Sequence, residues 1–437
     1  MNGELTREQQ MWRWRILIST YIGYAGYYLT RKAFTICKTS IAKDLGWELG
    51  DTAYIWAAFL LAYMIGQFIS GFVGRKWGPR ILLLGGLGVS IGCSIVFGIA
   101  NSFATFIVFM FINGLVQATG WPGTVGAVSQ WLRPEERGRI MGVWTTNHIV
   151  GNILYKSLGG LLLVYLGWRW CFFGLTAATL VTWWLLLVWQ RDKPEDVGLD
   201  PIMSKAEDAG RALSASDEQH AGLGEYLRLM MNPLVFCMGL GYFCVKYLRY
   251  ALDSWLPSFL NIQGLTVDWA SYYSMGFDFA GVVGTVLAGW ALSRVFKGNW
   301  AILCFLMALG TVLGCISVIY LGTTPLAAAI CFCLVGFMVY GPDSLLTGAA
   351  AIAVAGEMNG VAVAGIVNGI GSIGPVVQEV VIGQLMRGNK ESGIHTANMH
   401  ALLISIALAC LMLVVVWQLK VAHGKMDVEN ARAAGPQ

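Results

Sequence analysis

Hydrophobic residues occur along this chain in long runs, separated by short segments rich in polar residues, glycine and proline. A membrane-spanning helix needs about 20 mainly apolar residues, and the runs are of that order. The pattern therefore predicts twelve transmembrane helices. Their expected ranges are 15–37, 52–74, 81–100, 103–132, 138–163, 168–190, 232–260, 267–294, 300–321, 324–351, 358–385 and 397–420.

The composition supports an all-α membrane protein. Hydrophobic residues make up 56% of the 437 residues and charged residues 12%, whereas about a quarter of the residues are charged in a typical soluble protein. The 54 glycines suit close helix packing in lipid, and the 18 tryptophans suit the membrane interface. A soluble α/β enzyme would not contain so many apolar runs of about 20 residues.

One long polar segment interrupts the apolar pattern, at residues 191–231. We expect it to be a cytoplasmic linker between an N-terminal half, residues 1–190, and a C-terminal half, residues 232–437, which ends in a short cytoplasmic tail. The predicted spans then divide into two sets of six.

Similar landmarks recur in the two halves. "GFVGRKWGPR" begins at Gly71 and "GWALSRVFKGN" begins at Gly289, an offset of 289 − 71 = 218 residues. Arg31 and Arg249 are separated by the same offset, 249 − 31 = 218. This repetition predicts a duplicated six-helix unit, and hence two pseudo-symmetric halves.

Lysine and arginine predominate in the loops on one side of the predicted spans, the side that holds the linker and both termini. The positive-inside rule makes that side cytoplasmic. We therefore expect a multi-pass protein of the cell inner (plasma) membrane with both termini in the cytoplasm. The first residues, "MNGELTREQQMWRWR", contain no separate hydrophobic region and cleavage site, so we expect no cleaved signal peptide.

Several function classes receive no support from the residues. The net charge of +4 is small, and no lysine- and arginine-rich cluster resembles a nucleic-acid-binding surface. The ten cysteines lie in apolar runs without a CxxC pair, so we interpret them as free, buried thiols. The spacing of residues suggests no metal ligands and no nucleophile–base motif. We expect no enzyme activity, cofactor, metal or nucleic-acid partner.

Charged residues inside the predicted spans are the candidates for function. A charge at the centre of a bilayer costs roughly 2.5–3.5 kcal/mol on insertion scales, so it persists where it faces a cavity or has partners. The charged residues in the spans are Arg31, Lys32, Lys156, Lys246, Arg249, Asp253, Asp278, Asp343 and Glu379, with His148 as a possible polar neighbour.

The stretch "GYYLTRKAFTIC" brings two adjacent cations to the end of the first span. Tyr24, Tyr28 and Arg31 are spaced i, i+4 and i+7 and therefore share one helix face. Two phenol groups beside a guanidinium form a donor-rich surface suited to an oxyanion. Alternatively, Arg31 and Lys32 extend to the membrane interface as ordinary flanking residues.

A second cluster lies at the corresponding place in the other half. "FCVKYLRYALDSWLPSF" places Lys246, Arg249 and Asp253 at i, i+3 and i+7, again on one face. Asp253 could simply neutralise Arg249 at i+4. As pseudo-symmetry mates, however, Arg31 and Arg249 are predicted to converge on a central cavity.

The chemistry of such a cavity suits a phosphate group. A phosphate monoester carries about −1.5 to −2 charges at neutral pH, and arginine binds phosphate oxygens in a bidentate manner. Arg31 and Arg249, with Lys32 or Lys246, would balance that charge.

Other polar residues allow two interpretations each. His148 could donate to the anion or pack between helices, and Trp121 beside Pro122 could line the site or pack at a kink. We expect Asp278 to form a salt bridge with a cavity cation and Asp343 to be a hinge feature. Glu379 and Lys156 are expected to pair or to lie near helix ends.

The sequence resembles the organophosphate:phosphate antiporter family of the major facilitator superfamily. The stretches that carry the resemblance are "GYAGYYLTRKAF", "NGLVQATGWPG", "ERGRIMGVWTTNHIVGN", "GWRWCFF", "RDKPEDVGL", "DSWLPSFL" and "VFKGN". The resemblance implies the major facilitator fold and a phosphate site made by one arginine from the first helix and one from the seventh. The corresponding positions here are Arg31 and Arg249. The family's other site positions fall on Tyr24, Tyr28, Trp121, His148 and Asp278.

Four positions depart from the family's pattern. Gln67 stands where many members have a basic residue in the second helix, and Lys246 could supply that charge. Arg75 and Ser293 stand where the loops after the second and eighth helices usually carry an acidic residue. These departures put in question the charge pairing that usually locks the cytoplasmic ends of the helices together. Ser254 separates Asp253 from Trp255.

These observations predict a secondary transporter that exchanges an organic phosphate ester, such as a sugar phosphate or glycerol 3-phosphate, for inorganic phosphate by alternating access. Arg31, Arg249, Lys32, Lys246, Tyr24, Tyr28, His148 and Trp121 are expected to bind the substrate, and Asp278 and Asp253 to pair with charges during gating. One alternative is a membrane sensor of external hexose phosphate, which would have a histidine kinase as partner. Another is a proton-coupled organic anion symporter using Asp278, Asp343 or Glu379. We expect a monomer in the lipid bilayer.

Overall fold

The structure is a computed structural model, and it describes residues 5–132, 140, 144, 146–202, 229–347, 349–388 and 397–433. These residues form α-helices and one short 3-10 helix. The elements are α1 (Arg7–Leu45), α2 (Asp51–Ile99), α3 (Phe103–Gln117), α4 (Gly120–Gln130), α6 (Asn147–Leu166), α7 (Trp168–Trp189), η1 (Pro194–Val197), α10 (Pro233–Ile262), α11 (Val267–Arg294), α12 (Trp300–Leu321), α13 (Pro325–Thr347), α14 (Ala349–Gly388) and α15 (Ala397–Ala433).

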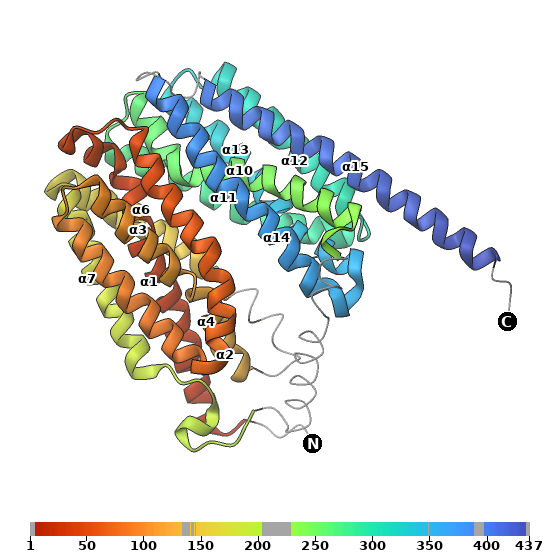
Figure 1. Ribbon diagram of the computed structural model, residues 1–437, viewed down its shortest axis with the longest axis horizontal. Coiled ribbons are helices and arrows are strands. Elements are labelled where there is room, and N and C mark those ends of the chain that lie inside the picture. The colour runs from red at the N-terminus through yellow and green to blue at the C-terminus, as the bar shows by residue number, and fades with distance from the viewer. Residues whose placement is uncertain are drawn as a thin grey trace. The chain divides into compact units, whose positions relative to one another are not determined.

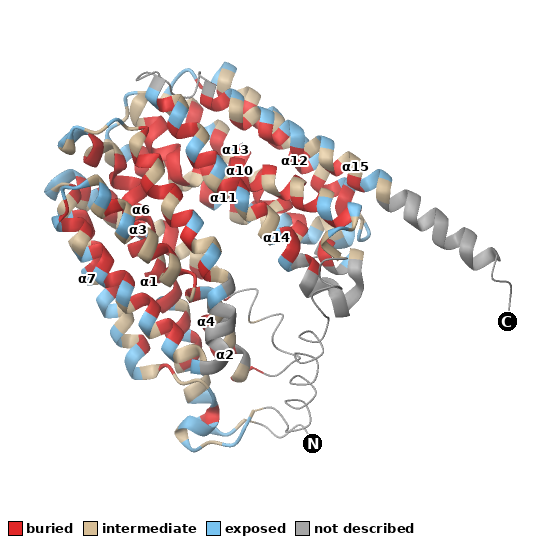
Figure 2. Cartoon of the chain, viewed as in Figure 1, coloured by how far each residue is buried: buried red, intermediate tan, exposed pale blue. Residues whose placement is uncertain are grey.

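The chain forms two compact units. The first contains residues 1–220 and 266–275, and the second contains residues 221–265 and 276–437. Figure 1 shows helices α1 to α7, which belong to the first unit, from red to yellow, and helices α10 to α15 from green to blue. Within each unit, buried residues gather where neighbouring helices face one another (Figure 2).

Eight helical segments among the described residues are long and apolar enough to cross a membrane. They are Trp77–Ile99, Phe103–Val128, Trp168–Trp189, Val267–Arg294, Trp300–Leu321, Pro325–Thr347, Gly365–Arg387 and Asn398–Leu419. The four other predicted spans correspond to α1, the first part of α2, α6 and α10. Three of these, α1, α6 and α10, carry the candidate residues Arg31, His148 and Arg249. The helices that do not meet this requirement for length and apolar composition are therefore largely those that carry the candidate residues.

Several helices differ in length from the predicted spans. α1, α14 and α15 continue well beyond the apolar runs, because hydrogen bonding along a helix does not end where the membrane-spanning sequence ends. The predicted span 103–132 is divided between α3 and α4. Part of the predicted span 138–163 lies outside the described residues.

Two glycines allow neighbouring helices to approach closely. A Cβ atom at Gly114 of α3 would lie 2.4 Å from the carbonyl oxygen of Phe59 on α2. A Cβ atom at Gly336 of α13 would lie 2.3 Å from the carbonyl oxygen of Phe277 on α11. Both helix pairs thus use backbone-to-backbone packing, as expected for helices associating in lipid.

The expected break between the second and third spans occurs at Gly78, inside α2. Gly78 has φ 79° and ψ 161°, a conformation essentially restricted to glycine. The helix restarts at Pro79, and the Arg80 amide donates a hydrogen bond to Asp192 Oδ1 at 2.6 Å. The pKa of Asp192 is raised above its usual value, because the effect of burial exceeds the lowering effect of this hydrogen bond. The segment after α7, part of the "RDKPEDVGL" stretch, therefore caps the second part of α2.

Gly78→Ala is expected to destabilise the protein by about 2 kcal/mol or more, because φ would be strained. The added Cβ would also lie 2.5 Å from Asp192 Oδ2 and displace the cap. The apparent melting temperature of the detergent-solubilised protein should fall by several degrees. Gly85→Ala, in the same helix but with open space around its Cβ position, is the matched control. Equal melting temperatures for the two variants would contradict the expectation.

The ten cysteines are all free, as predicted, but the prediction that all are buried is wrong. Six are buried, and Cys237, Cys331, Cys333 and Cys410 are only half-buried. A helix that crosses a membrane exposes apolar side chains to lipid, so an apolar run does not imply burial within the protein.

Candidate functional site

The first cluster lies on one face of α1, as the spacing of its residues predicts. The Arg31 guanidinium carbon is 4.8 Å from the ring centre of Tyr28 and 4.9 Å from that of Tyr63 on α2. The Tyr24 and Tyr28 ring centres are 5.8 Å apart. Arg31 is only 8% exposed, so the alternative of an arginine extended to the interface does not describe this conformation.

Gln117, at the end of α3, fixes the orientation of Arg31. Arg31 Nε donates to Gln117 Oε1 at 3.1 Å. The amide nitrogen of Gln117 donates to Thr30 Oγ1 at 2.9 Å and to Ser90 Oγ at 2.7 Å. Ser90 in turn donates to Asn113 Oδ1 at 2.6 Å. Since Gln117 is fully buried, its amide orientation is determined by these partners, and its carbonyl oxygen faces Arg31.

Lys32 points in a different direction from Arg31. Its ammonium nitrogen is 5.1 Å from the ring centre of Trp56 on α2. Trp56 and Tyr63 are seven residues apart and share one face of α2. The two adjacent cations therefore contact the same neighbouring helix at different depths.

Trp121 and His148 both approach the tyrosines of α1. The Trp121 ring centre is 5.6 Å from that of Tyr24, and the His148 ring centre is 6.5 Å from that of Tyr28. The close approach of α6 to α1 depends on Gly151, where a Cβ atom would lie 2.7 Å from Tyr28 Cβ. Five predicted residues of this unit are therefore close together in the structure. They are Tyr24, Tyr28, Arg31, Trp121 and His148.

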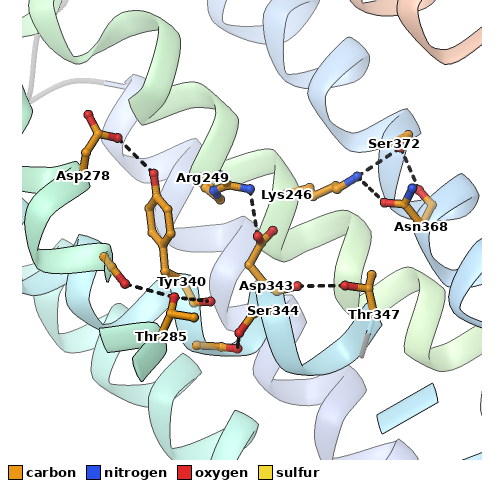
Figure 3. A network of polar contacts seen from close by, with 12 residues as sticks. Lys246, Arg249, Asp278, Thr285, Tyr340, Asp343, Ser344, Thr347, Asn368 and Ser372 are labelled. Atoms are coloured by element: carbon orange, nitrogen blue, oxygen red, sulfur yellow. Dashed lines mark hydrogen bonds and ion pairs between the residues drawn. The ribbon is translucent and has the colours of Figure 1, made fainter. Parts of the chain in front are cut away.

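The second cluster surrounds Arg249 on α10. Its Nη1 atom is 2.8 Å from Oδ2 of Asp343 on α13, and these atoms form an ion pair (Figure 3). Asp253, which the sequence offers as a possible neutralising partner of Arg249, is not the carboxylate in this contact. Asp343 is therefore the carboxylate paired with Arg249 among the described residues, a contact that its predicted role as a hinge feature does not include. A partner 94 residues away cannot be found from helical spacing.

Tyr340 connects Arg249 with Asp278. The Arg249 guanidinium carbon is 4.5 Å from the Tyr340 ring centre, and the Tyr340 hydroxyl donates to Asp278 Oδ1 at 3.0 Å (Figure 3). The sequence predicts a salt bridge from Asp278 to a cavity cation, and this hydrogen bond is one contact that Asp278 makes. Asp278 is thus linked to Arg249 through an aromatic side chain.

Lys246 lies one turn before Arg249 and points toward α14. Its ammonium donates to Asn368 Oδ1 at 2.8 Å and to Ser372 Oγ at 3.1 Å. Its nitrogen is also 4.9 Å from the Tyr242 ring centre. The two cations of α10 are therefore held differently, one by a carboxylate and one by neutral acceptors.

Two further buried charges, Glu379 and Lys156, have identifiable contacts. Glu379 accepts hydrogen bonds from Ser254 Oγ and from Trp255 Nε1. Lys156 donates to the carbonyl oxygen of Ser274 at 3.2 Å. Both Glu379 and Lys156 are fully buried, and they lie inside α14 and α6 rather than at the helix ends. Ser254, noted in the sequence as an interruption, provides a donor to Glu379.

Gln117, Tyr63, Asp343 and Tyr340 are among the contacts of the two arginines that the sequence did not predict. Gln117 lies within the quoted stretch "NGLVQATGWPG", where an amide in an apolar run was the available signal. No group of three or more His, Cys, Asp or Glu side chains in the described part of the chain could hold a metal ion.

Residues 20–378 match the sequence profile of the Major Facilitator Superfamily. The chain belongs to this superfamily. The match extends from α1 into α14 and includes both arginine clusters. The predicted fold class is therefore confirmed, and the protein is a multi-pass membrane protein of a transporter superfamily.

Within the Major Facilitator Superfamily, the chain is similar to proteins named for organic phosphates and to a membrane sensor protein. It is 27% identical over 360 residues to a probable hexose phosphate transport protein of Chlamydia pneumoniae, covering 79% of each chain. It is 29% identical over 353 residues to the glycerol-3-phosphate transporter of Bacillus subtilis, covering 78% of this chain and 79% of the relative. It is 29% identical over 360 residues to the membrane sensor protein UhpC of Salmonella typhimurium, covering 80% of each. The predicted family resemblance is confirmed.

Solved structures of major facilitators have the same fold. The chain is similar to a bacterial homologue of the human lysosomal transporter Spinster, in an inward-facing and unoccupied conformation, with a TM-score of 0.73. The similarity covers 93% of this chain and 95% of that one, at 16% sequence identity. At this identity the comparison supports the fold alone.

Proposed function

We propose that this protein exchanges an organic phosphate ester for inorganic phosphate across the membrane. The observation that carries the proposal is the pair of arginines, one in each unit, each held on a helix among aromatic rings at equivalent places in the repeat. Arg31 and Arg249 both bind the phosphate group in the transport cycle. The two units alternate access to the substrate as in other repeat-based transporters.

The chemistry of the two clusters favours a phosphate over an uncharged solute. Arg31 and Lys32 are adjacent in the first unit, and Lys246 and Arg249 are one turn apart in the second. A charge held at this depth requires a compensating anion, and an arginine fork matches phosphate oxygens. Two relatives are named for hexose phosphate and glycerol 3-phosphate, and these are the substrates that we propose for the ester.

The test is uptake of radiolabelled phosphate into proteoliposomes containing the full chain. The vesicles are preloaded with inorganic phosphate, glycerol 3-phosphate, glucose 6-phosphate or buffer. We expect rapid uptake only into vesicles that contain phosphate or an accepted ester, and the ranking of the esters identifies the preferred one. Uptake into buffer-loaded vesicles that depends on an inward proton gradient would contradict exchange and favour the symporter.

The relative named as a membrane sensor makes sensing the second candidate function. A sensor would bind glucose 6-phosphate from outside without exchanging phosphate. Saturable binding of that ester, combined with no uptake into any preloaded vesicle, would favour the sensor, with a histidine kinase as its partner. We also propose that the protein is a monomer in the inner membrane with both termini in the cytoplasm.

A further inference from the structure

The ion pair between Arg249 and Asp343 leaves part of both groups unused. Its one short contact joins Arg249 Nη1 and Asp343 Oδ2 at 2.8 Å. Arg249 Nε and Asp343 Oδ1 are both buried and have no hydrogen-bond partner among the described residues. A guanidinium and a carboxylate can form two parallel hydrogen bonds. This pair is therefore held by one contact where its chemistry permits two.

Asp343 occupies a position on Arg249 that an oxyanion ligand would also use. A carboxylate oxygen at 2.8 Å accepts from the guanidinium as a phosphate oxygen would. A phosphate has more oxygens and up to two charges, so it can also satisfy the Nε atom that Asp343 leaves unpaired. Asp343 is thus an internal anion on Arg249. The Nε atom that it leaves unpaired gives phosphate an additional contact that favours its replacement.

We propose that Asp343 is a tethered competitor that the phosphate group of the substrate must displace from Arg249. The inference rests on the proposed function, because it assumes that Arg249 binds phosphate. Asp343 then sets the affinity threshold of the site. An anion that interacts with Arg249 only as well as a carboxylate does gains little by replacing Asp343.

Lys246 provides a second cation for the displaced carboxylate. Lys246 lies one turn from Arg249 on α10 and is attracted electrostatically by Asp343. Its ammonium currently donates to the neutral side chains of Asn368 and Ser372, and it points away from Asp343 (Figure 3). A turn of Asp343 from Arg249 toward Lys246 would keep the carboxylate beside a positive charge while phosphate occupies Arg249.

The competition makes a quantitative prediction. The apparent dissociation constant equals the intrinsic one divided by the fraction of protein with Arg249 available. An ion pair formed in about 90–99% of unoccupied molecules would therefore weaken apparent binding about 10- to 100-fold. The factor is the same for every anion that uses Arg249, because the competitor is the same.

The test compares binding of inorganic phosphate to the full chain in lipid nanodiscs. Asp343→Asn, which keeps the shape but removes the charge, is expected to bind phosphate at least about 10-fold more tightly. Sulfate affinity should improve by the same factor. Asp343→Ala is a second variant in case one of them folds poorly, and melting temperatures check both. Ser344→Ala, whose hydroxyl bonds only its own helix at Gly341 among the contacts seen, is the matched control and should bind like the wild type.

A double-mutant cycle separates this inference from the proposed function. In an Arg249→Ala background, Asp343→Asn should no longer strengthen binding, because the competition has no target. If wild-type protein exchanges phosphate but Asp343→Asn and Asp343→Ala bind it no more tightly, the inference is wrong and the proposed function stands. If neither the wild type nor these variants bind phosphate, both are wrong.

Discussion

Replacing either Arg31 or Arg249 by alanine is expected to reduce phosphate exchange by about 100-fold or more. Each arginine would lose two hydrogen bonds to a charged group, worth about 1.5–3 kcal/mol each, and about 1.4 kcal/mol corresponds to a factor of ten. Both residues are at the centre of their clusters, against aromatic rings at 4.5–4.8 Å. The measurement is the initial rate of labelled phosphate uptake into phosphate-loaded proteoliposomes.

Loss of folding must be distinguished from loss of binding. Arg249→Ala leaves the largely buried carboxylate of Asp343 without its ion pair, which destabilises a protein strongly. Arg249→Ala combined with Asp343→Ala removes both charges and should recover the melting temperature but not the exchange. Arg169→Ala is the control for arginine loss, because Arg169 is partly exposed and 3.9 Å from Asp44. Exchange above about a tenth of the wild-type rate in either Arg31→Ala or Arg249→Ala would contradict a two-arginine site.

Interactions within one helix were predictable from the sequence. Tyr24, Tyr28 and Arg31 are close in the structure because residues at i, i+4 and i+7 share a helix face. The break at Gly78 followed from the combination of glycine, proline and charge between two apolar runs. These features depend only on helical periodicity and local backbone chemistry, so no knowledge of tertiary contacts was required.

Interactions between helices were not predictable in the same way. Asp343 was assigned to a hinge because it follows Gly341 and Pro342, whereas tertiary packing places it against Arg249. Asp253 has the ideal i+4 spacing from Arg249, but the short ion pair of Arg249 is with Asp343. Periodicity gives the face of a helix but not which neighbouring helix meets that face. The counter-ion of a buried charge therefore has to come from the structure.

The contrast between the two arginines leads to the second large effect. Arg31 Nε donates to a neutral amide, Gln117, whereas Arg249 donates to a carboxylate, Asp343. Gln117→Glu would place a carboxylate about 3 Å from Arg31 and so create the kind of competitor that Arg249 already has. Opposite charges 4 Å apart attract by about 4 kcal/mol at an effective dielectric constant of 20. We expect phosphate to bind at least about 10-fold more weakly, and exchange to fall in proportion.

The same substitution also removes the amide donor to Thr30 and Ser90, so a loss of stability is expected beside the loss of affinity. Gln190→Glu separates the two effects, because Gln190 is equally buried in the same unit but lies at the end of α7 and bonds the Arg191 carbonyl. Both variants should melt at lower temperature, and only Gln117→Glu should weaken phosphate binding. If the two variants bind phosphate with equal affinity, Gln117 does not determine how Arg31 meets an anion. A specific loss in Gln117→Glu would mean that the neutrality of this amide keeps Arg31 available to phosphate.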